Sequence, residues 1–217
     1  MKRLNTAVFD VDGTLLDTTE GVLSSVAYTI EKYHLMPLNG QQLKSFIGPP
    51  IQDSFEKYYG TQGSKLQELA ECFREHYKKY DLLKATPYPG IFDALQQLKS
   101  AGIKLAIATY KRQDYATRLL EHFSFNQYTS VIYGADNYNK LKKKDIIIQC
   151  MQELGIDDYS SAVMIGDSDN DAIGAKSIGM NFLGVTYGFG FCSKEDVACY
   201  PSIGYAATPV ELIQYFL

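Results

Sequence analysis

The sequence predicts an α/β protein in which a doubly wound parallel sheet carries an inserted helical domain. Short apolar runs alternate with segments that repeat apolar residues at helical spacing, which is typical of strand–helix–strand units. The stretch from about 18 to 84 breaks this alternation, because it contains helical patterns without a convincing strand. A chain of 217 residues is long enough for one core and one such insertion.

Five short apolar runs are the expected strands. Each is nearly continuously apolar, as expected of strands that are covered by helices on both faces. The fifth run is the weakest of the set. The runs are 6–11, 103–108, 130–133, 162–165 and 181–185.

Helices are expected between these strands. Apolar residues repeat at helical spacing from Ile91 to Leu98 before a stop at Gly102, and again from Ile146 to Leu154 before Gly155. Two further helices are expected around 115–120 and at 209–216, the second of which is the last predicted element of the chain.

The insertion contains at least two predicted helices. Val22, Val26 and Ile30 mark the first, and apolar positions within 66–77 mark another. Gly48-Pro49-Pro50 interrupts the helical pattern, and prolines near 87–89 accompany the return to the α/β pattern. We therefore expect a core domain of residues 1–17 and 85–217 and a helical domain of residues 18–84.

Composition excludes several classes of protein. With 21 basic and 25 acidic residues, the net charge is −4 and no basic block is present, so nucleic acid is not an expected partner. No window approaches the roughly 18 uncharged apolar residues of a membrane span, and the N-terminus lacks the features of a signal peptide. We expect a cytoplasmic protein that does not bind membranes, either a monomer or a weak homo-oligomer. Its four cysteines form no CxxC pair and are expected to be free thiols: Cys72, Cys150, Cys192 and Cys199.

Two groups of acidic residues follow two of the predicted strands. Asp10 and Asp12 come at the end of the first, and Asp167 and Asp171 follow the fourth. In a parallel sheet these strand ends lie on one edge, where ligands bind, and residues one position apart on a strand point to the same side. Carboxylates this close together favour a hard cation such as Mg²⁺, which keeps one of them ionised as a nucleophile.

A hydroxyl and a lysine complete the expected site. Thr109 ends the second predicted strand, where its hydroxyl and the N–H groups after it, such as that of Tyr110, can bind a phosphate oxygen. The run 140–144 contains four lysines just before a predicted helix. One lysine is needed to balance the charge of the carboxylates and a phosphate.

The ordered set of these motifs strongly resembles the haloacid dehalogenase-like phosphatase superfamily. Its four motifs correspond to Asp10-Val11-Asp12-Gly13-Thr14, Thr109, a lysine, and Gly166-Asp167-Ser168-x-x-Asp171. The resemblance implies a Rossmann-like core, and the insertion looks like the helical C1-type cap of that family. Flanking segments such as Tyr88-Pro89-Gly90-Ile91 resemble its phosphoglycolate phosphatase branch.

Roles for individual residues follow from this resemblance. Asp10 would be the nucleophile, Asp12 the general acid and then base, and Thr109, with Tyr110, would bind the phosphoryl group. The lysine motif favours Lys143, with Lys144 second and Lys140 and Lys142 behind. The expected Mg²⁺ ligands are Asp10, Asp12 through its backbone carbonyl, and Asp167. Asp171 would coordinate the ion through water or hold the lysine. In the cap, a substrate-specificity loop would be formed by Gly48, Pro49 and Pro50.

The resemblance implies Mg²⁺-dependent hydrolysis of a small phosphorylated metabolite through an aspartyl phosphate. The physiological substrate stays open among phosphoglycolate, pyrophosphate, a sugar phosphate and a nucleotide monophosphate. One alternative is a sugar phosphomutase of the same superfamily, although Thr14 and Gly166 stand where such mutases tend to carry Val and Glu. Another is a non-enzymatic phospho-accepting or binding module, although receiver modules are shorter and lack a helical insertion.

Overall fold

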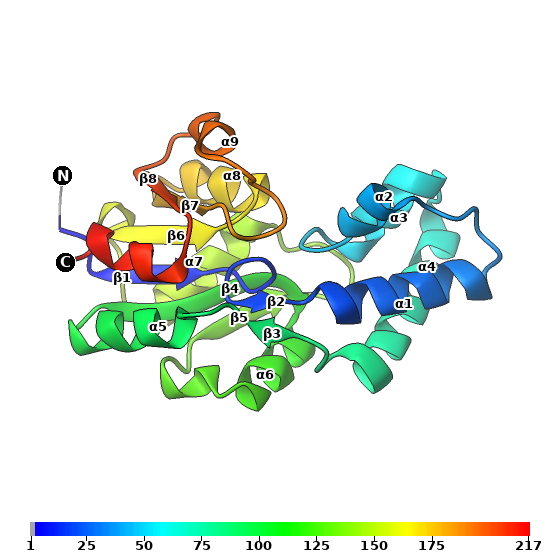
Figure 1. Cartoon of the computed structure of the whole chain (residues 1–217), viewed down its shortest axis with the longest axis horizontal. Coiled ribbons are helices and arrows are strands. Elements are labelled where there is room, and N and C mark those ends of the chain that lie inside the picture. The colour runs from blue at the N-terminus through cyan, green and yellow to red at the C-terminus, as the bar shows by residue number, and fades with distance from the viewer. Residues whose placement is uncertain (1–2) are drawn as a thin grey trace. The chain divides into compact units, whose positions relative to one another are not determined.

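The computed structural model describes residues 3–217 of the chain, which divides into two compact units (Figure 1). Unit 1 consists of the chain up to Asp17 together with Pro87–Leu217, and unit 2 is the single segment Thr18–Thr86. A two-stranded sheet of β2 (Leu16–Asp17) and β3 (Thr86–Pro87) stands where the chain passes from one unit to the other.

Unit 1 is built on a six-stranded parallel sheet with the strand order β5-β4-β1-β6-β7-β8. The first strand is central, since Thr6 lies opposite Lys104 on one side and Ala162 on the other. This arrangement confirms the predicted α/β fold class. The strands are β1 (Thr6–Phe9), β4 (Lys104–Arg112), β5 (Ile132–Ala135), β6 (Ala162–Gly166), β7 (Asn181–Val185) and β8 (Gly204–Ala206).

Helices cover both faces of this sheet. Alternate strand residues such as Val8, Ala106 and Met164 pack with α7 and α8 in one buried cluster, so the intervening residues face the other side. There α5 packs against β4 and η4, and α6 against β4 and β5 (Figure 1). The helices are α5 (Ile91–Ser100), α6 (Gln113–His122), α7 (Lys143–Glu153), α8 (Asp169–Ser177) and α9 (Lys194–Ala198), with 3-10 turns η2 (Phe125–Gln127), η3 (Tyr159–Ser161) and η4 (Pro209–Tyr215).

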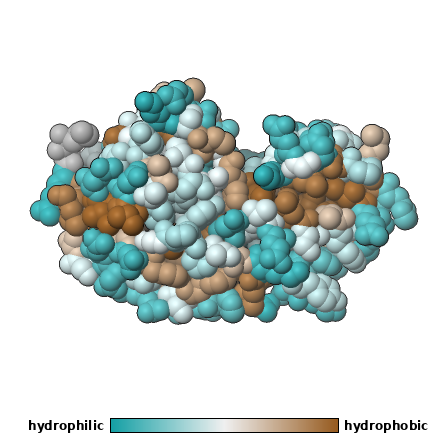
Figure 2. Space-filling model, viewed as in Figure 1, coloured by the Kyte–Doolittle hydropathy of each residue, from teal (hydrophilic) through white to brown (hydrophobic). Residues whose placement is uncertain are grey.

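Several elements of unit 1 differ from the sequence-based expectation, and the helices α8 and α9 were not predicted. The strand β4 continues to Arg112, four residues beyond the apolar run. Its last residues are polar and so carry no apolar signal, but Arg112 still pairs with Ala135 of β5. The short edge strand β8 lacks an apolar run. The last element is a 3-10 helix instead of an α-helix, and Figure 2 shows hydrophobic residues gathered over this C-terminal segment, where Val210 and Leu217 are exposed.

The regular elements of unit 2 are all helices apart from its last residue, Thr86, which belongs to β3. The predicted apolar repeat of Val22, Val26 and Ile30 is the buried face of α1, because residues three to four apart share one side of a helix. The interruption at Gly48-Pro49-Pro50 separates α2 from α3. The helices are α1 (Thr19–Lys32), α2 (Gly40–Lys44), α3 (Ile51–Tyr59), α4 (Gly63–His76) and the π-helical turn η1 (Tyr77–Asp81).

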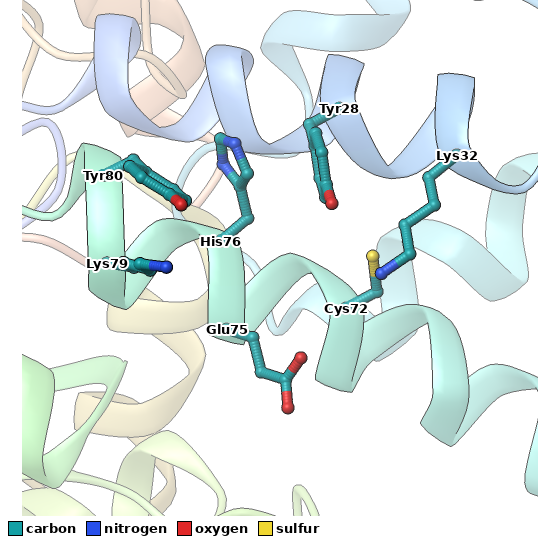
Figure 3. A pocket seen from close by; sticks show the side chains of 7 residues that line it. All are labelled: Tyr28, Lys32, Cys72, Glu75, His76, Lys79 and Tyr80. Carbon is teal, nitrogen blue, oxygen red and sulfur yellow. The ribbon is translucent and has the colours of Figure 1, made fainter.

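A buried carboxylate ties α1 to η1 within unit 2. Asp81 accepts a hydrogen bond of 2.7 Å from the hydroxyl of Ser25 and lies 3.0 Å from Nδ1 of His76 and 2.8 Å from Nζ of Lys84. The ring of His76 also stacks on Tyr28 and helps to line a pocket of about 190 Å³ between α1, α4 and η1 (Figure 3). Across the described residues, no helix has the length and apolarity needed to cross a membrane.

Candidate active site

Three buried carboxylates meet where β1 and β6 end. Asp10 directly follows β1, and Asp167 and Asp171 follow β6. Each offers an oxygen within 4.8 Å of the others, and none is more than 5% exposed. The two strands are adjacent and parallel, so their ends share one edge. The structure thus brings together the two acidic groups that the sequence predicts at one site.

The turn after β1 requires glycine at position 13. Gly13 has φ +82°, in the left-handed region that favours glycine, and a Cβ there would overlap the carboxylate of Asp167. The missing side chain therefore allows the turn after Asp10 to pack directly against the acidic group from β6.

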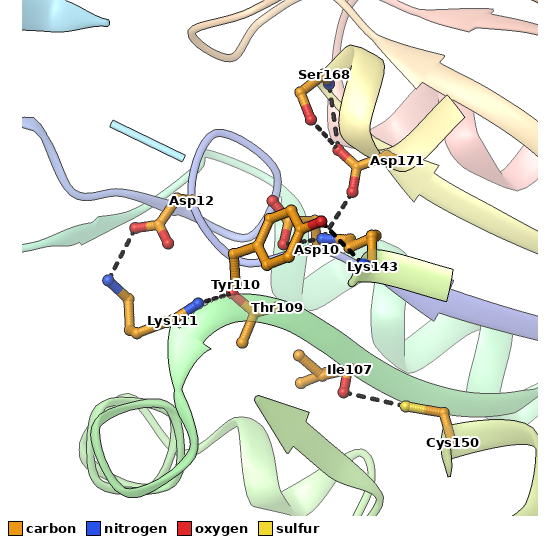
Figure 4. Close-up of polar contacts among 10 residues, drawn as sticks. All are labelled: Asp10, Asp12, Ile107, Thr109, Tyr110, Lys111, Lys143, Cys150, Ser168 and Asp171. Carbon is orange, nitrogen blue, oxygen red and sulfur yellow. Dashed lines mark hydrogen bonds and ion pairs between the residues drawn. The ribbon is translucent and has the colours of Figure 1, made fainter. Parts of the chain in front are cut away.

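Lys143 is the lysine that lies among these acids. It is the first residue of α7, and its Nζ lies 2.7 Å from Oδ1 of Asp10 and 2.7 Å from Oδ1 of Asp171 (Figure 4). Its backbone N–H donates to the hydroxyl of Tyr110 at 2.9 Å, so the Tyr110 side chain helps to position this lysine. The neighbouring candidates are all exposed: Lys140, Lys142 and Lys144.

Asp171 is oriented by the start of its own helix. Its Oδ2 accepts hydrogen bonds from the hydroxyl of Ser168 at 2.6 Å and from the Ser168 N–H at 3.2 Å, in a capping box of α8. Its other oxygen is thereby directed to Lys143. In this structure Asp171 holds the lysine directly, which is one of the two roles expected for it.

The carboxylate of Asp12 has a different partner. Its Oδ1 lies 3.1 Å from Nζ of Lys111, and both side chains are about 95% buried. The N–H of Lys111 donates to the hydroxyl of Thr109 at 3.1 Å. Sequence reasoning assigned no role to Lys111, although its position two residues after Thr109 in β4 was a usable signal, because alternate strand residues share a face.

The segment 187–191, after β7, encloses Asp167. Oδ2 of Asp167 accepts hydrogen bonds from the backbone N–H groups of Phe189 at 2.7 Å and Gly190 at 3.1 Å. The hydroxyl of Tyr187 donates to the carbonyl of Thr14 at 3.1 Å. Sequence analysis did not identify these amide donors, because backbone groups leave no residue-type signal.

Burial and mutual repulsion shift the protonation of the site. Burial, and then the neighbouring Asp171, Asp12 and Asp167, raise the pKa of Asp10 to about 8 against the opposing effect of Lys143. Burial and Asp171 raise the pKa of Asp167 to about 7 against the amides of the enclosing segment. Burial alone would lower the pKa of Lys143, but Asp10 and Asp171 raise it above its ordinary value. The acidic groups therefore need more positive charge than the lysine supplies.

The remaining predicted site residues lie in unit 2. Gly48 has φ +97°, and Pro50 precedes the first turn of α3. Close by in the sequence, Gln52 is buried and accepts a hydrogen bond of 2.9 Å from the buried guanidinium of Arg74. The role expected for Gly48, Pro49 and Pro50 in substrate choice stays a prediction.

Comparisons with known proteins place the chain in a family. Residues 7–185 match the model of the haloacid dehalogenase-like hydrolases. The chain is 30% identical to a 5'-nucleotidase of Pseudomonas aeruginosa, with 95% of this chain and 93% of that protein covered. It is 30% identical to a pyrophosphatase of Halalkalibacterium halodurans (85% and 84% covered) and 32% identical to a phosphoglycolate phosphatase of Agrobacterium fabrum (84% and 81% covered).

A solved structure agrees with this result. The crystal structure of a "predicted phosphatase" from Clostridium acetobutylicum is 33% identical, covers 98% of both chains and superimposes with a TM-score of 0.91. The family match spans every one of the four motifs that form the acidic site. The chain therefore belongs to the haloacid dehalogenase-like hydrolase family.

Proposed function

We propose that this phosphatase hydrolyses a small phosphorylated metabolite of the phosphoglycolate type, with Mg²⁺ and through an aspartyl phosphate. The observation that carries the proposal is the placement of Asp10, whose carboxylate lies at the end of the central strand between Lys143 and two further acids. A carboxylate so placed can act as a nucleophile toward a phosphoryl group whose charge the lysine offsets.

The donor set fits a hard divalent cation. Asp10, Asp167 and Asp171 offer only oxygen atoms, within 4.8 Å of one another, and Mg²⁺ prefers oxygen ligands. When all four carboxylates, Asp12 included, are ionised, they exceed the two paired lysines by two negative charges. We propose that Asp10, the backbone carbonyl of Asp12 and Asp167 hold Mg²⁺. When bound, the ion offsets charge on the phosphoryl oxygens and favours ionised Asp10.

The chain's own residues account for both chemical steps. An oxygen of Asp10 forms a bond to phosphorus while the bond from phosphorus to the leaving oxygen breaks, and Asp12 gives that oxygen a proton. Asp12 then takes a proton from a water molecule, which attacks phosphorus and releases Asp10 and inorganic phosphate. Lys143, the hydroxyl of Thr109 and the N–H of Tyr110 hold the phosphoryl oxygens during both steps.

Unit 2 is proposed to be the cap that selects the substrate. Hydrolysis of phosphate monoesters is so slow in water that such a site must lower its barrier by about 20 kcal/mol or more, and exclusion of bulk water contributes to this. A separate helical unit inserted after the first catalytic motif is suited to that task. The names of the relatives support phosphoryl hydrolysis but differ in leaving group, so the class of substrate depends on residues outside the shared motifs.

Phosphate release from a panel of phosphomonoesters and pyrophosphate tests the proposal. The purified chain is assayed with Mg²⁺, with excess chelator, and with chelator followed by restored Mg²⁺. We expect multiple turnovers on a small ester such as 2-phosphoglycolate, loss with chelator, and recovery with Mg²⁺. Transfer of the phosphoryl group within a sugar phosphate, without release of inorganic phosphate, would instead support a mutase.

A further inference from the structure

The site contains two buried lysines with separate partners. Figure 4 shows Lys143 with Asp10 and Asp171, and Lys111 at another side of the cluster with Asp12. The side chain of Lys111 is only 6% exposed, like that of its partner at 5%. Removing an ammonium group from water is costly, so a second buried lysine at this place calls for a function of its own.

The partner of Lys111 defines where its charge acts. In the proposed reaction Asp12 gives a proton to the leaving oxygen, so the leaving group must lie beside the Asp12 carboxylate. Nζ of Lys111 is 3.1 Å from that carboxylate and therefore lies at the leaving-group side of the reaction. The charge of Lys143 is directed to Asp10, the residue that attacks phosphorus.

We propose that Lys111 makes the enzyme selective for phosphomonoesters whose leaving group carries its own anionic group, such as a carboxylate or a second phosphate close to the ester oxygen. This inference rests on the proposed function. An anionic leaving group gives Lys111 a charged hydrogen-bond acceptor beside Asp12. A neutral leaving group accepts a weaker hydrogen bond from the ammonium, and a cationic leaving group is repelled by it.

The structure also supplies the means to hold Lys111 in place. The bond from its backbone N–H to Thr109 fixes the start of the side chain on the strand that carries the phosphate-binding hydroxyl. The same strand therefore presents one group to the phosphoryl oxygens and, two residues later, a cation to the leaving group. Substrate length is thereby restricted to leaving groups whose anion lies near the ester oxygen.

Three esters of nearly equal size provide the test. The leaving groups of 2-phosphoglycolate, 2-hydroxyethyl phosphate and phosphoethanolamine carry a carboxylate, a neutral hydroxyl and an ammonium group. We expect kcat/KM of Lys111→Met to fall roughly 10- to 100-fold more on phosphoglycolate than on the neutral ester, the range of a hydrogen bond to a charged group. A loss common to all three esters measures the effect of Lys111 on its partner Asp12. Lys111→Glu should shift preference toward phosphoethanolamine, and Lys111→Arg should retain the preference for the carboxylate.

Controls separate the possible outcomes. The exposed Lys144→Met measures the effect of losing any positive charge near this helix, and melting temperatures identify variants that fail to fold. If Lys111→Met does not fold, the preference among the three esters is compared between Lys111→Gln, which lacks the charge, and Lys111→Arg, which keeps it. Equal losses of kcat/KM on all three esters in Lys111→Met, or an unchanged order of preference in Lys111→Glu, would overturn the proposal that Lys111 selects the leaving group. Failure of the wild-type chain on these esters and on p-nitrophenyl phosphate would reject the proposed function itself, and the inference with it.

Discussion

The ammonium of Lys143 lies 2.7 Å from a carboxylate oxygen of Asp10, although 133 positions separate the two residues in the sequence. Asp10 follows the central strand β1, whereas Lys143 begins α7, which packs against β4 and β5. The contact therefore depends on the fold of the whole of unit 1. It also gives a physical basis for choosing among the lysines of the run 140–144.

We expect Lys143→Ala to lower kcat/KM on every substrate by roughly 10²- to 10³-fold, because it removes a charge that acts on the phosphoryl group in the transition state. Lys140→Ala and Lys144→Ala, which alter exposed side chains, should retain nearly full activity. Steady-state kinetics on two unrelated esters checks this. A silent Lys143→Ala beside an inactive Lys144→Ala would show that the assignment of the lysine is wrong.

Asp10→Asn should abolish turnover and leave the fold intact. An amide cannot form the bond to phosphorus, so we expect a loss of about 10³-fold or more. The melting temperature should stay close to that of the wild type, because the substitution removes one of several mutually repelling buried carboxylates. Phosphate release and thermal unfolding are measured together, and activity above a few per cent of wild type would refute the nucleophile assignment.

Gly188→Ala should weaken Mg²⁺ binding. A Cβ at position 188 would overlap the carbonyl of Gly13 and the carboxylate of Asp167, so the segment that donates two N–H groups to Asp167 must move. Because an ion that binds the native state raises its melting temperature, the rise on adding Mg²⁺ should be smaller in this variant. Gly40→Ala, where a Cβ meets nothing within 4 Å, is the matched control. An identical Mg²⁺ response in both variants would contradict the prediction.

Asp81 should make unit 2 sensitive to acid. Burial opposes ionisation of this carboxylate, but hydrogen bonds from Lys84 and Ser25 outweigh it and lower its pKa. A lowered pKa in the folded state means that the stabilisation is present above the unfolded pKa, about 3.9, and is lost as the pH falls through the folded value. Asp81→Asn should therefore destabilise the protein at pH 7, with a difference from wild type that shrinks below about pH 4.

Urea unfolding between pH 7 and pH 3 measures that difference. Glu68→Gln, which changes an exposed carboxylate of the same unit, should show little effect at either end of the range. A difference between Asp81→Asn and wild type that stays constant over the range would exclude this carboxylate as the acid-sensitive group.

Ile47→Ala should alter substrate preference if unit 2 is the selector. Ile47 precedes the loop Gly48-Pro49-Pro50 in the sequence and is 4% exposed. Removing part of an apolar contact changes discrimination between substrates by roughly 10-fold or more, whereas hydrolysis of p-nitrophenyl phosphate should change less. Val26→Ala, a buried substitution in α1 of the same unit, controls for lost stability. A uniform loss of activity of Ile47→Ala on all substrates would reject the role of unit 2 in substrate selection.

Much of the core could be predicted because strand and helix periodicities are local. The acids after β1 and β6 were expected at one edge, since the ends of parallel strands define it. In contrast, β8 could not be predicted, because an edge strand of three residues with one buried side chain carries no periodic signal. The segment η4 packs against α5, and such a contact between distant segments leaves no signal in local periodicity.

The site was predictable in its acids and less so in its supporting contacts. Lys143 could be favoured only from the resemblance to a family, because four lysines of one run are equivalent until α7 is placed against the sheet. The ion pair of Asp12 with Lys111 depends on the spacing of β1 and β4. Similarly, the N–H groups that contact Asp167 belong to a segment whose path is set by its glycines.

The central position of β1 has a consequence for how the chain folds during synthesis. This strand is synthesised before both of its neighbours in the sheet, the strands that begin at Lys104 and Ala162. Unit 2, which is continuous in the sequence, can fold as soon as it emerges. The apolar strand Thr6–Phe9 must meanwhile stay unpaired until about half of the 217 residues have been made, because its first partner begins at Lys104. A chaperone that binds short apolar segments would therefore bind this protein at β1.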